Sequence, residues 1–327
     1  MQASRIGFVV GALALALWPL AAGSYGIDFV TKTMIYAILA LSLELLVGTT
    51  GLVCFGQAAL FGLAGYAVVQ LSPQDAPASL FWLLPACMAA ATAYALFMGA
   101  LSLRTKGVYF IMVTLAFAQM AYYLVHDTPL GGGTDGIYLS FKPVAALGPV
   151  LLLDLGHALT LYYFVLAALA AAFVLLALLL RSPFGRALAG IRINEQRMRA
   201  TGFSTYSYKL AAFVLSGAIA GLGGFLFAVK DGYVNPELLS WHLSGAMLVM
   251  IILGGIGHLR GAVIGAFAFA LLQEFFKSEA LFGDFAKHWL LGLGLTIIVS
   301  VALLPRGLIG VGAVLANRLR RRVGGTV

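Results

Sequence analysis

The segment most able to carry chemistry is a basic stretch between two apolar runs, residues 181–209, which reads RSPFGRALAGIRINEQRMRATGFSTYSYK. It contains a single acid, Glu195, and six basic residues: Arg181, Arg186, Arg192, Arg197, Arg199 and Lys209. Lys and Arg accumulate in the cytoplasmic loops of membrane proteins, so the pattern predicts a cytoplasmic loop. The chemistry available to such a loop is the binding of a cytosolic partner.

Capping residues divide this segment into two expected helices. Ser182 can cap a helix that starts at Pro183 and runs to about Ile193. Asn194 can cap a second helix that ends at Gly202, with two arginines placed to complement the helix dipole in its last turn, Arg197 and Arg199. The alternative is a basic interfacial helix that rests on anionic lipid, which explains the arginines but explains the second capped helix less well.

Motifs for nucleotide or metal chemistry are missing from the sequence. There is no Gly-x-x-x-x-Gly-Lys-Ser/Thr phosphate loop and no His-Glu-x-x-His pair, so any nucleotide-driven work must come from a partner. Cys54 and Cys87 fall within apolar runs, where a thiol is usually a small apolar side chain, and they indicate neither a disulfide nor a metal site. An intramembrane enzyme that uses Ser216 or Ser244 as its nucleophile stays open as the least favoured alternative.

A second group of candidate residues lies inside the apolar runs. A carboxylate there is costly unless it faces a wet cavity, is paired or is protonated, which makes Glu44 a candidate for a solute path. Its alternative role is that of a structural carboxyl hydrogen-bonded between helices. Gln57 and Gln119 could also line a path, although a buried amide that bridges two helices is the alternative. The full set of path candidates is Glu44, Gly56, Gln57, Thr114 and Gln119.

The elements that must position these residues are membrane helices. The chain is 62% hydrophobic and 10% charged, with a mean hydropathy of +1.00, which leaves too little polar surface for a soluble globule. Its apolar runs are continuous and about twenty residues long, as a helix that crosses a bilayer requires. We predict one all-α transmembrane domain over residues 1–327 with about ten transmembrane or re-entrant helices. The expected spans are 6–22, 30–48, 52–71, 80–101, 108–125, 158–181, 209–229, 244–256, 262–276 and 287–304.

Ten passes place both termini on one side, and the basic residues indicate which side. With a cytoplasmic N-terminus, fifteen of the 20 Lys and Arg residues fall in cytoplasmic segments, including a basic tail at 313–327. The net charge of +8 then follows from topology and does not require nucleic acid. Residues 1–23 could also pass for a signal peptide, but an uncleaved first helix is the preferred interpretation.

Glycines interrupt two of the expected spans. The run 244–256 reaches only about thirteen residues before Gly254, Gly255 and Gly257, so we expect a helix bend there, in a segment that either spans or dips back with 262–276 as a hairpin. Further glycines punctuate residues 48–65 and permit close helix approach or unwinding. The glycine-rich outer loop at 126–157 could cap a pore mouth, meet an external partner or serve as a flexible connector.

Three stretches of the chain resemble the permeases of bacterial branched-chain amino acid ABC importers. Residues 182–228, SPFGRALAGIRINEQRMRATGFSTYSYKLAAFVLSGAIAGLGGFLFA, resemble the coupling segment of that family and the helix after it. Residues 51–66 resemble its early glycine-rich span, and residues 232–266 resemble its later segment with a Gly-Gly-x-Gly bend. Cys54, Glu44 and Gln119 depart from the family pattern, and these departures put the identity of the solute in doubt.

The resemblance implies an ABC importer permease fold in the bacterial inner membrane, with both termini in the cytoplasm. The chain would form half of a path for branched-chain amino acids or related small solutes, and a second homologous permease chain would form the other half. A periplasmic solute-binding protein would deliver the solute, and membrane lipid would surround the helices. The chain itself would be neither an enzyme nor a holder of any cofactor.

The resemblance also implies two cytosolic ABC ATPase subunits that use ATP and Mg. They would dock on the coupling segment, residues 182–208, and the expected contacts are Arg186, Arg192, Glu195, Arg197, Arg199 and Gly202. An ion-coupled secondary transporter is the main alternative function, and it would need an inverted repeat and a site for the coupling ion.

Overall fold

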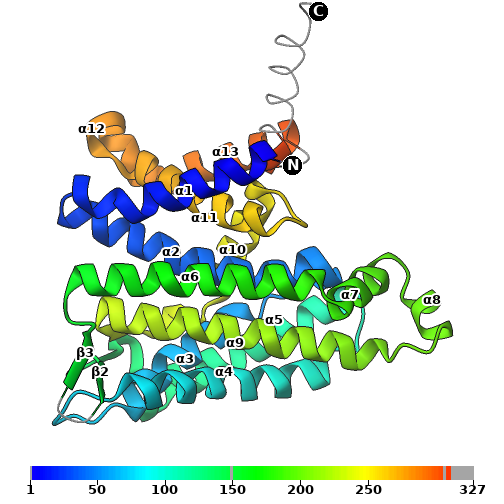
Figure 1. Ribbon diagram of the computed structural model, residues 1–327, viewed down its shortest axis with the longest axis horizontal. Coiled ribbons are helices and arrows are strands. Elements are labelled where there is room, and N and C mark those ends of the chain that lie inside the picture. The colour runs from blue at the N-terminus through cyan, green and yellow to red at the C-terminus, as the bar shows by residue number, and fades with distance from the viewer. Residues whose placement is uncertain (1, 148–149, 305–306, 311–327) are drawn as a thin grey trace, which may run out of the picture.

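The computed structural model describes residues 2–147, 150–304 and 307–310, so the predicted basic tail at 313–327 lies outside the described residues. Long helices lie roughly side by side along one direction (Figure 1). Each predicted span overlaps a helix, and the all-α membrane fold is confirmed. These helices are α1 (Gln2–Ala21), α2 (Ser24–Glu44), α3 (Gln57–Leu71), α4 (Leu80–Ser102), α5 (Val108–Asp127), α6 (Ala158–Arg181), α9 (Thr205–Asp231), α10 (Trp241–Gly254), α11 (Leu259–Lys277) and α13 (Trp289–Leu303).

Within the described residues, six helices are long and apolar enough to cross a membrane: α2, α4, α5, α6, α9 and α11. The apolar helices α3, α10 and α13 are shorter, with 15, 14 and 15 residues. Short elements connect them: η2 (Pro129–Gly131), η3 (Gly133–Asp135), η4 (Pro236–Leu239), α12 (Glu279–Phe282) and η5 (Gly283–His288).

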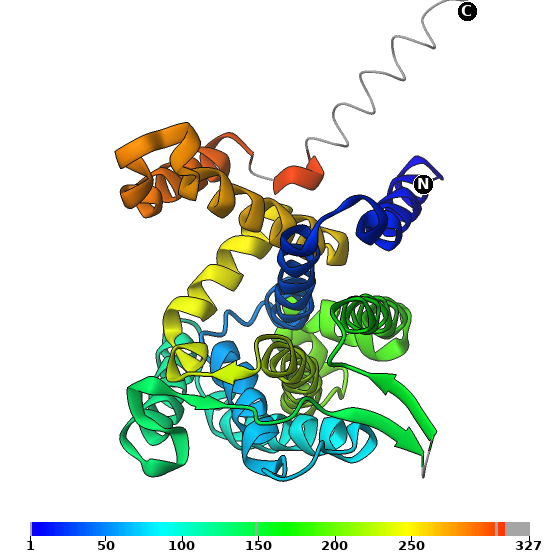
Figure 2. The ribbon, with the colours of Figure 1, turned by 90° about the vertical axis from the view of Figure 1, so that its left-hand side faces the viewer.

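The core is built around α2 and α9. Viewed end-on, these two helices lie inside the group formed by α3, α4, α6 and α11 (Figure 2). The α2 region is apolar on every side, as expected of a helix enclosed by others, and 89% of its apolar window is buried. In α9, Gly217 and Gly221 lie against Ala95 and Ala91 of α4, while Gly224 lies against the carbonyl of Phe61 in α3. Small residues in α9 therefore allow α3 and α4 to pack at backbone distance.

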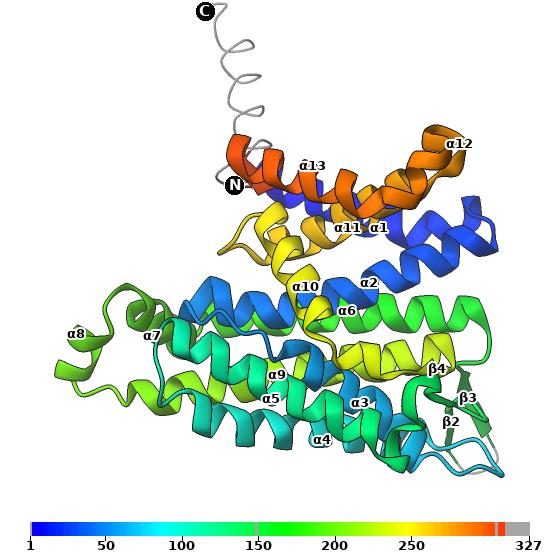
Figure 3. The same ribbon diagram turned by 180° about the vertical axis from the view of Figure 1, so that it is seen from behind.

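The first interrupted crossing follows α2. That helix continues as a π-helix, η1 (Leu45–Thr50), and stops at Gly51, whose φ of +74° favours glycine. Residues 51–56 then run back into the bundle without helical structure, and α3 begins at Gln57 (Figure 3). The expected span 52–71 is therefore wrong over its first five residues, because a non-helical segment occupies them.

The second interrupted crossing leads into α10. After α9 the chain turns inward through β4 (Tyr233–Val234) and η4, and α10 starts in the interior of the bundle (Figure 3). It then ends at a tight turn in which Gly255 and Gly257 have φ of +116° and +90°. α11 runs back from that turn. We interpret residues 232–254 together as one crossing.

A side chain of the second interrupted crossing satisfies backbone groups of the first. The Ser244 hydroxyl, on α10, donates to the Phe55 carbonyl at 2.7 Å and accepts from the Ala58 amide at 3.1 Å. The Phe55 amide donates to the Thr114 hydroxyl of α5 at 3.3 Å. Unwound backbone is tolerated at membrane depth only when such partners exist, so Ser244 and Thr114 allow the break before α3.

One end of the bundle carries α7 (Pro183–Ile193) and α8 (Glu195–Ala200); we refer to it as the α7–α8 end. The first residues of α1 and the last residues of α13 lie at this same end (Figures 1 and 3), which agrees with an even number of passes.

The opposite end, here the strand end, contains short strands that the sequence analysis did not anticipate. β1 (Ile137–Tyr138) pairs antiparallel with β4, and β2 (Val144–Leu147) pairs antiparallel with β3 (Val150–Asp154). Gly136 adopts a φ of +67°, and a Cβ at this position would overlap the carbonyl of Val234. The glycine-rich loop is therefore attached to the segment that enters the bundle before α10, and is not a loose connector.

A matched pair of glycine substitutions tests the close packing of α10 on α11. A Cβ on Gly265 would overlap the Met250 carbonyl, whereas a Cβ on Gly245 would meet nothing within 4 Å. We expect Gly265→Ala to destabilise the protein by about 1–3 kcal/mol through overpacking. Gly245→Ala should be neutral or stabilising by up to about 1 kcal/mol, because alanine favours helix. Thermal unfolding in detergent, followed by tryptophan fluorescence, measures both, and equal unfolding temperatures would contradict the described packing.

Candidate coupling surface and solute path

The basic segment folds into the two short helices that its capping residues predict. The Ser182 hydroxyl accepts a hydrogen bond from the Gly185 amide at 3.4 Å at the start of α7. The Asn194 side chain accepts from the Arg197 amide at 2.9 Å at the start of α8. The second helix stops before Gly202, whose φ is +86°. α8 projects beyond the rest of the bundle (Figure 1), which places it outside the layer of membrane helices.

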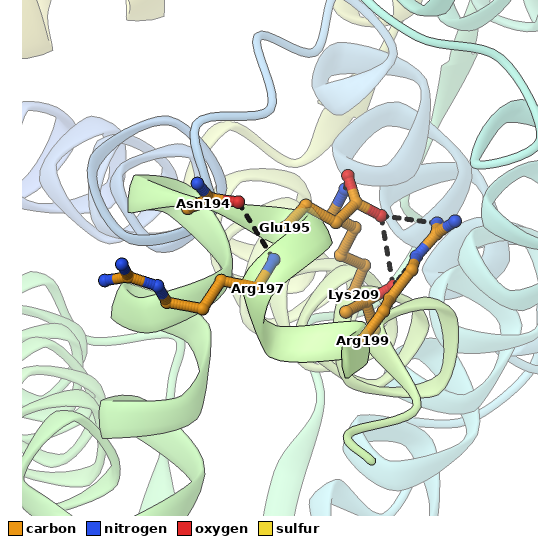
Figure 4. Close-up of polar contacts among 6 residues, drawn as sticks. Asn194, Glu195, Arg197, Arg199 and Lys209 are labelled. Atoms are coloured by element: carbon orange, nitrogen blue, oxygen red, sulfur yellow. Dashed lines mark hydrogen bonds and ion pairs between the residues drawn. The ribbon is translucent and has the colours of Figure 1, made fainter. Parts of the chain in front are cut away.

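Glu195 holds α8 against the start of α9 (Figure 4). One carboxylate oxygen accepts from Arg199 at 2.6 Å and from the Thr205 hydroxyl at 3.0 Å, while the other accepts from Lys209 at 2.7 Å. Partial burial raises the pKa of Glu195, but the hydrogen bonds and positive charge of these partners outweigh it and lower the pKa to about 2. The carboxylate is therefore ionised near neutral pH and holds three partners from two helices.

The six expected contact residues of this segment divide into two groups. Glu195 and Arg199 bond to each other, and the Arg192 guanidinium turns back to the bundle, where it donates to the Gly48 carbonyl. Arg186 and Arg197 are exposed, and in Figure 4 the Arg197 side chain extends away from Glu195. Gly202 ends α8. All four arginines of the set are exposed, but Arg192 and Arg199 also bond within the chain.

The most exposed apolar side chain at this end was missed by the sequence analysis. Ile193, the last residue of α7, is 86% exposed and lies between the two short helices. An isoleucine directly before the capping Asn194 was visible in the sequence, but its solvent exposure depends on the angle between the two helices. Together Ile193, Arg186 and Arg197 form what we term the α7–α8 surface, which has an apolar centre and basic neighbours.

Three of the path candidates lie at the break before α3. Gly56 is buried against Met98, and a Cβ at Gly56 would lie 3.2 Å from the Thr114 carbonyl. The Gln57 amide donates to the hydroxyls of Ser42 and Ser216, both at 2.8 Å, and so connects α3 with α2 and α9. Gln57 therefore has the bridging role that was the alternative to lining a path.

Glu44 and Gln119 lie elsewhere. Glu44 is 2% exposed, and its carboxylate accepts from the Gly257 amide at 2.6 Å. The structure thus brings together two features that the sequence analysis treated separately, the intramembrane acid and the Gly254–Gly257 bend. Gln119 is half-buried on α5.

Long apolar helices, two crossings with unwound segments and a projecting helical pair with an exposed basic and apolar surface define a polytopic helical membrane protein. The sequence profile of a family described as "Branched-chain amino acid transport system / permease component" matches residues 26–304. The chain belongs to this permease family, and it is a multi-pass membrane component of a transport system.

Two relatives align over almost the whole chain. The high-affinity branched-chain amino acid transport system permease protein LivM of Escherichia coli (strain K12) is 30% identical over 92% of this chain and 74% of its own length. The protein of the same name from Salmonella typhimurium is 28% identical over the same shares. The autoinducer 2 import system permease protein LsrC of Photorhabdus laumondii is 30% identical over 35% of this chain and 37% of its own length.

The depressed pKa of Glu195 predicts how the order of α8 depends on pH. Because the pKa falls from an ordinary 4.5 to about 2, the stabilisation of α8 by its partners is complete above pH 4.5 and is lost as the pH falls toward 2. Amide hydrogen exchange, corrected for intrinsic rates, should show constant α8 protection between pH 7 and 5 and lower protection at pH 3. Glu195→Gln should lower the protection of the α8 amides already at pH 7. Protection equal to that of the native chain would show that Glu195 does not hold α8 in place.

Proposed function

We propose that this chain is the permease subunit of an ATP-driven ABC importer and forms half of the path for branched-chain amino acids or related small solutes. The observation that carries the proposal is the family match over residues 26–304, together with two relatives named for that transport that align over 92% of this chain and 74% of their own length. The sequence contains no phosphate loop of its own. A permease that imports at the expense of ATP must therefore receive the energy from another subunit, through a surface that the subunit can reach.

The α7–α8 surface is the proposed docking site for two cytosolic ATPase subunits, which use ATP and Mg. The exposed Ile193 would fit an apolar groove on the partner, and the neighbouring Arg186 and Arg197 would pair with acidic residues at the edge of that groove. The charge distribution supports a cytoplasmic position for this end. Basic residues lie between α4 and α5, along 181–209 and at the start of α11, all at the α7–α8 end. The chain would accordingly sit in the bacterial inner membrane with both termini in the cytoplasm.

The remaining proposed partners are a second homologous permease chain, a periplasmic solute-binding protein at the strand end and membrane lipid. A path between two permease chains would follow exposed rather than enclosed faces of each. Gln119, half-buried on α5, fits that position better than Gln57, which is fully buried and already bonded to two serines. Gly56 and Thr114 would influence the path through the unwound segment beside them.

Transport by the reconstituted system tests the proposed function. Proteoliposomes that contain this chain, its partner permease and the ATPases, supplied with the binding protein, should import radiolabelled leucine, isoleucine or valine only when ATP is present. Omission of the binding protein should abolish uptake, because solute delivery is then lost. Uptake driven by an ion gradient without the ATPases would instead support a secondary transporter, in which unwound helices that meet at mid-membrane are common.

Replacement of Ile193 tests the docking surface. We expect Ile193→Asp to weaken the affinity of the ATPase subunits by about thirtyfold, because a central interface residue contributes about 2 kcal/mol or more. The matched control is Tyr138→Asp, which alters an equally exposed apolar side chain, 74% exposed, at the strand end. Co-purification and surface plasmon resonance report the affinity. Equal losses in both variants, or none in either, would contradict docking at this surface.

A further inference from the structure

Arg192 satisfies a helix end at the α7–α8 end of the bundle. η1 stops at Thr50, so the carbonyls of its last turn have no partner within the helix. The Arg192 guanidinium, which comes from α7, donates to one of them, the Gly48 carbonyl. A cation at this position also interacts favourably with the negative end of the helix dipole. The stem of Arg192 lies close to Gly51, where a Cβ would be 3.4 Å from Cγ of the arginine. α7 is thereby attached to the end of the α2 region.

Glu44 attaches the same region to a third element. Its carboxylate lies over Gly48, where a side chain would overlap it, so glycine is required for this approach. From there the carboxylate accepts the Gly257 amide of the α10–α11 turn at 2.6 Å. Gly257 has a φ of +90°, which directs its amide toward the acid. This bond satisfies one oxygen of the nearly inaccessible carboxylate, whereas the other, Oε2, has no hydrogen-bond partner among the described residues.

Arg192 and Glu44 also act on each other and on the same turn. The guanidinium attracts the carboxylate electrostatically. A Cβ built on Gly257 would lie 3.9 Å from the guanidinium nitrogen Nη1, so the arginine and the acid approach Gly257 together. We refer to Glu44, Gly48, Arg192 and Gly257 as the joint. The joint connects three elements that are far apart in sequence: α7, the end of the α2 region and the α10–α11 turn.

We infer that Glu44 and Arg192 are positioning residues that make α7 and the α10–α11 turn move as one unit during transport. A displacement of α7 would pass through the joint to α10. The other end of α10 carries Ser244, which is bonded to Phe55 and Ala58 at the break before α3. A continuous set of contacts therefore connects α7 with the unwound segment at residues 51–56. This inference rests on the proposed function, since it assumes that a partner displaces α7.

Distances between spin labels test whether the two elements move together. Cys54 and Cys87 are buried, so cysteines introduced at the exposed positions Ala189 of α7 and Ile256 of the turn can be labelled selectively. In the complete complex, we expect one Ala189–Ile256 distance with and without ATP, while the distance from Ala189 to a label at Tyr138 changes. Glu44→Leu should make the Ala189–Ile256 distance depend on ATP. A native distance that changes with ATP, or a variant distance that does not, would overturn the inference.

Solute imported per ATP hydrolysed provides the second readout. Glu44→Leu and Arg192→Met should each lower this ratio by about tenfold, within the range usual for coupling between sites. Because both substitutions break one connection, the double variant should be no worse than the worse single variant. Losses that multiply would mean that the two residues act separately and would refute the joint.

Two further variants guard against simple loss of folding. Glu44→Gln keeps the shape and the acceptor for the Gly257 amide but removes the attraction to Arg192, so we expect a smaller loss of coupling. Lys230→Met is the control: this side chain is 7% exposed and pairs with Asp28 and Asp231 at 2.8 Å, at the strand end. It should lower the unfolding temperature without changing solute per ATP. An equal loss of solute per ATP in Lys230→Met would assign the effect to stability alone.

The two proposals fail in different ways. Absence of ATP-dependent uptake by the native complex would reject the proposed function before any variant is measured. Native uptake with an unchanged ratio in Glu44→Leu and Arg192→Met would reject the joint and leave the importer function in place.

Discussion

Inside the hydrocarbon region of a membrane, each backbone amide and carbonyl must find a partner within the protein. The two interrupted crossings of this chain depend on this constraint, because residues 51–56 and 232–235 lack the internal bonds of a helix. Ser244 satisfies groups on both sides of the first break, and pairing of β1 with β4 satisfies part of the second. The first crossing therefore depends on the second, because loss of the Ser244 hydroxyl removes the partner of the Phe55 carbonyl and of the Ala58 amide.

The same constraint explains the charges in the interior. Carbonyls at the end of η1 draw the Arg192 guanidinium inward, and an amide in a glycine turn supplies a partner for Glu44. These side chains complete the backbone of neighbouring elements, and they do so at the point where three such elements meet. One oxygen of Glu44 thus has a local structural role, as the alternative to a place on a solute path expects.

The sequence was sufficient for the parts of the structure that depend on neighbouring residues. Apolar runs located the membrane helices, and Ser182 and Asn194 located α7 and α8, because a capping residue acts on amides two or three positions away. The start of α3 was misplaced because residues 52–71 are apolar throughout, and the residue that stabilises the unwound segment, Ser244, is remote in the chain. The inward direction of Arg192 and the exposure of Ile193 likewise depend on how distant helices pack.

The bonds by which Glu195 holds α8 in place have a thermodynamic consequence for the binding of a partner. A six-residue helix is too short to be stable in water by itself, and a partner that had to order it would lose affinity to conformational entropy. Arg199, Thr205 and Lys209 order α8 in the isolated chain through bonds to one carboxylate. A partner of the α7–α8 surface therefore meets a preformed shape, and more of the contact energy remains as binding free energy.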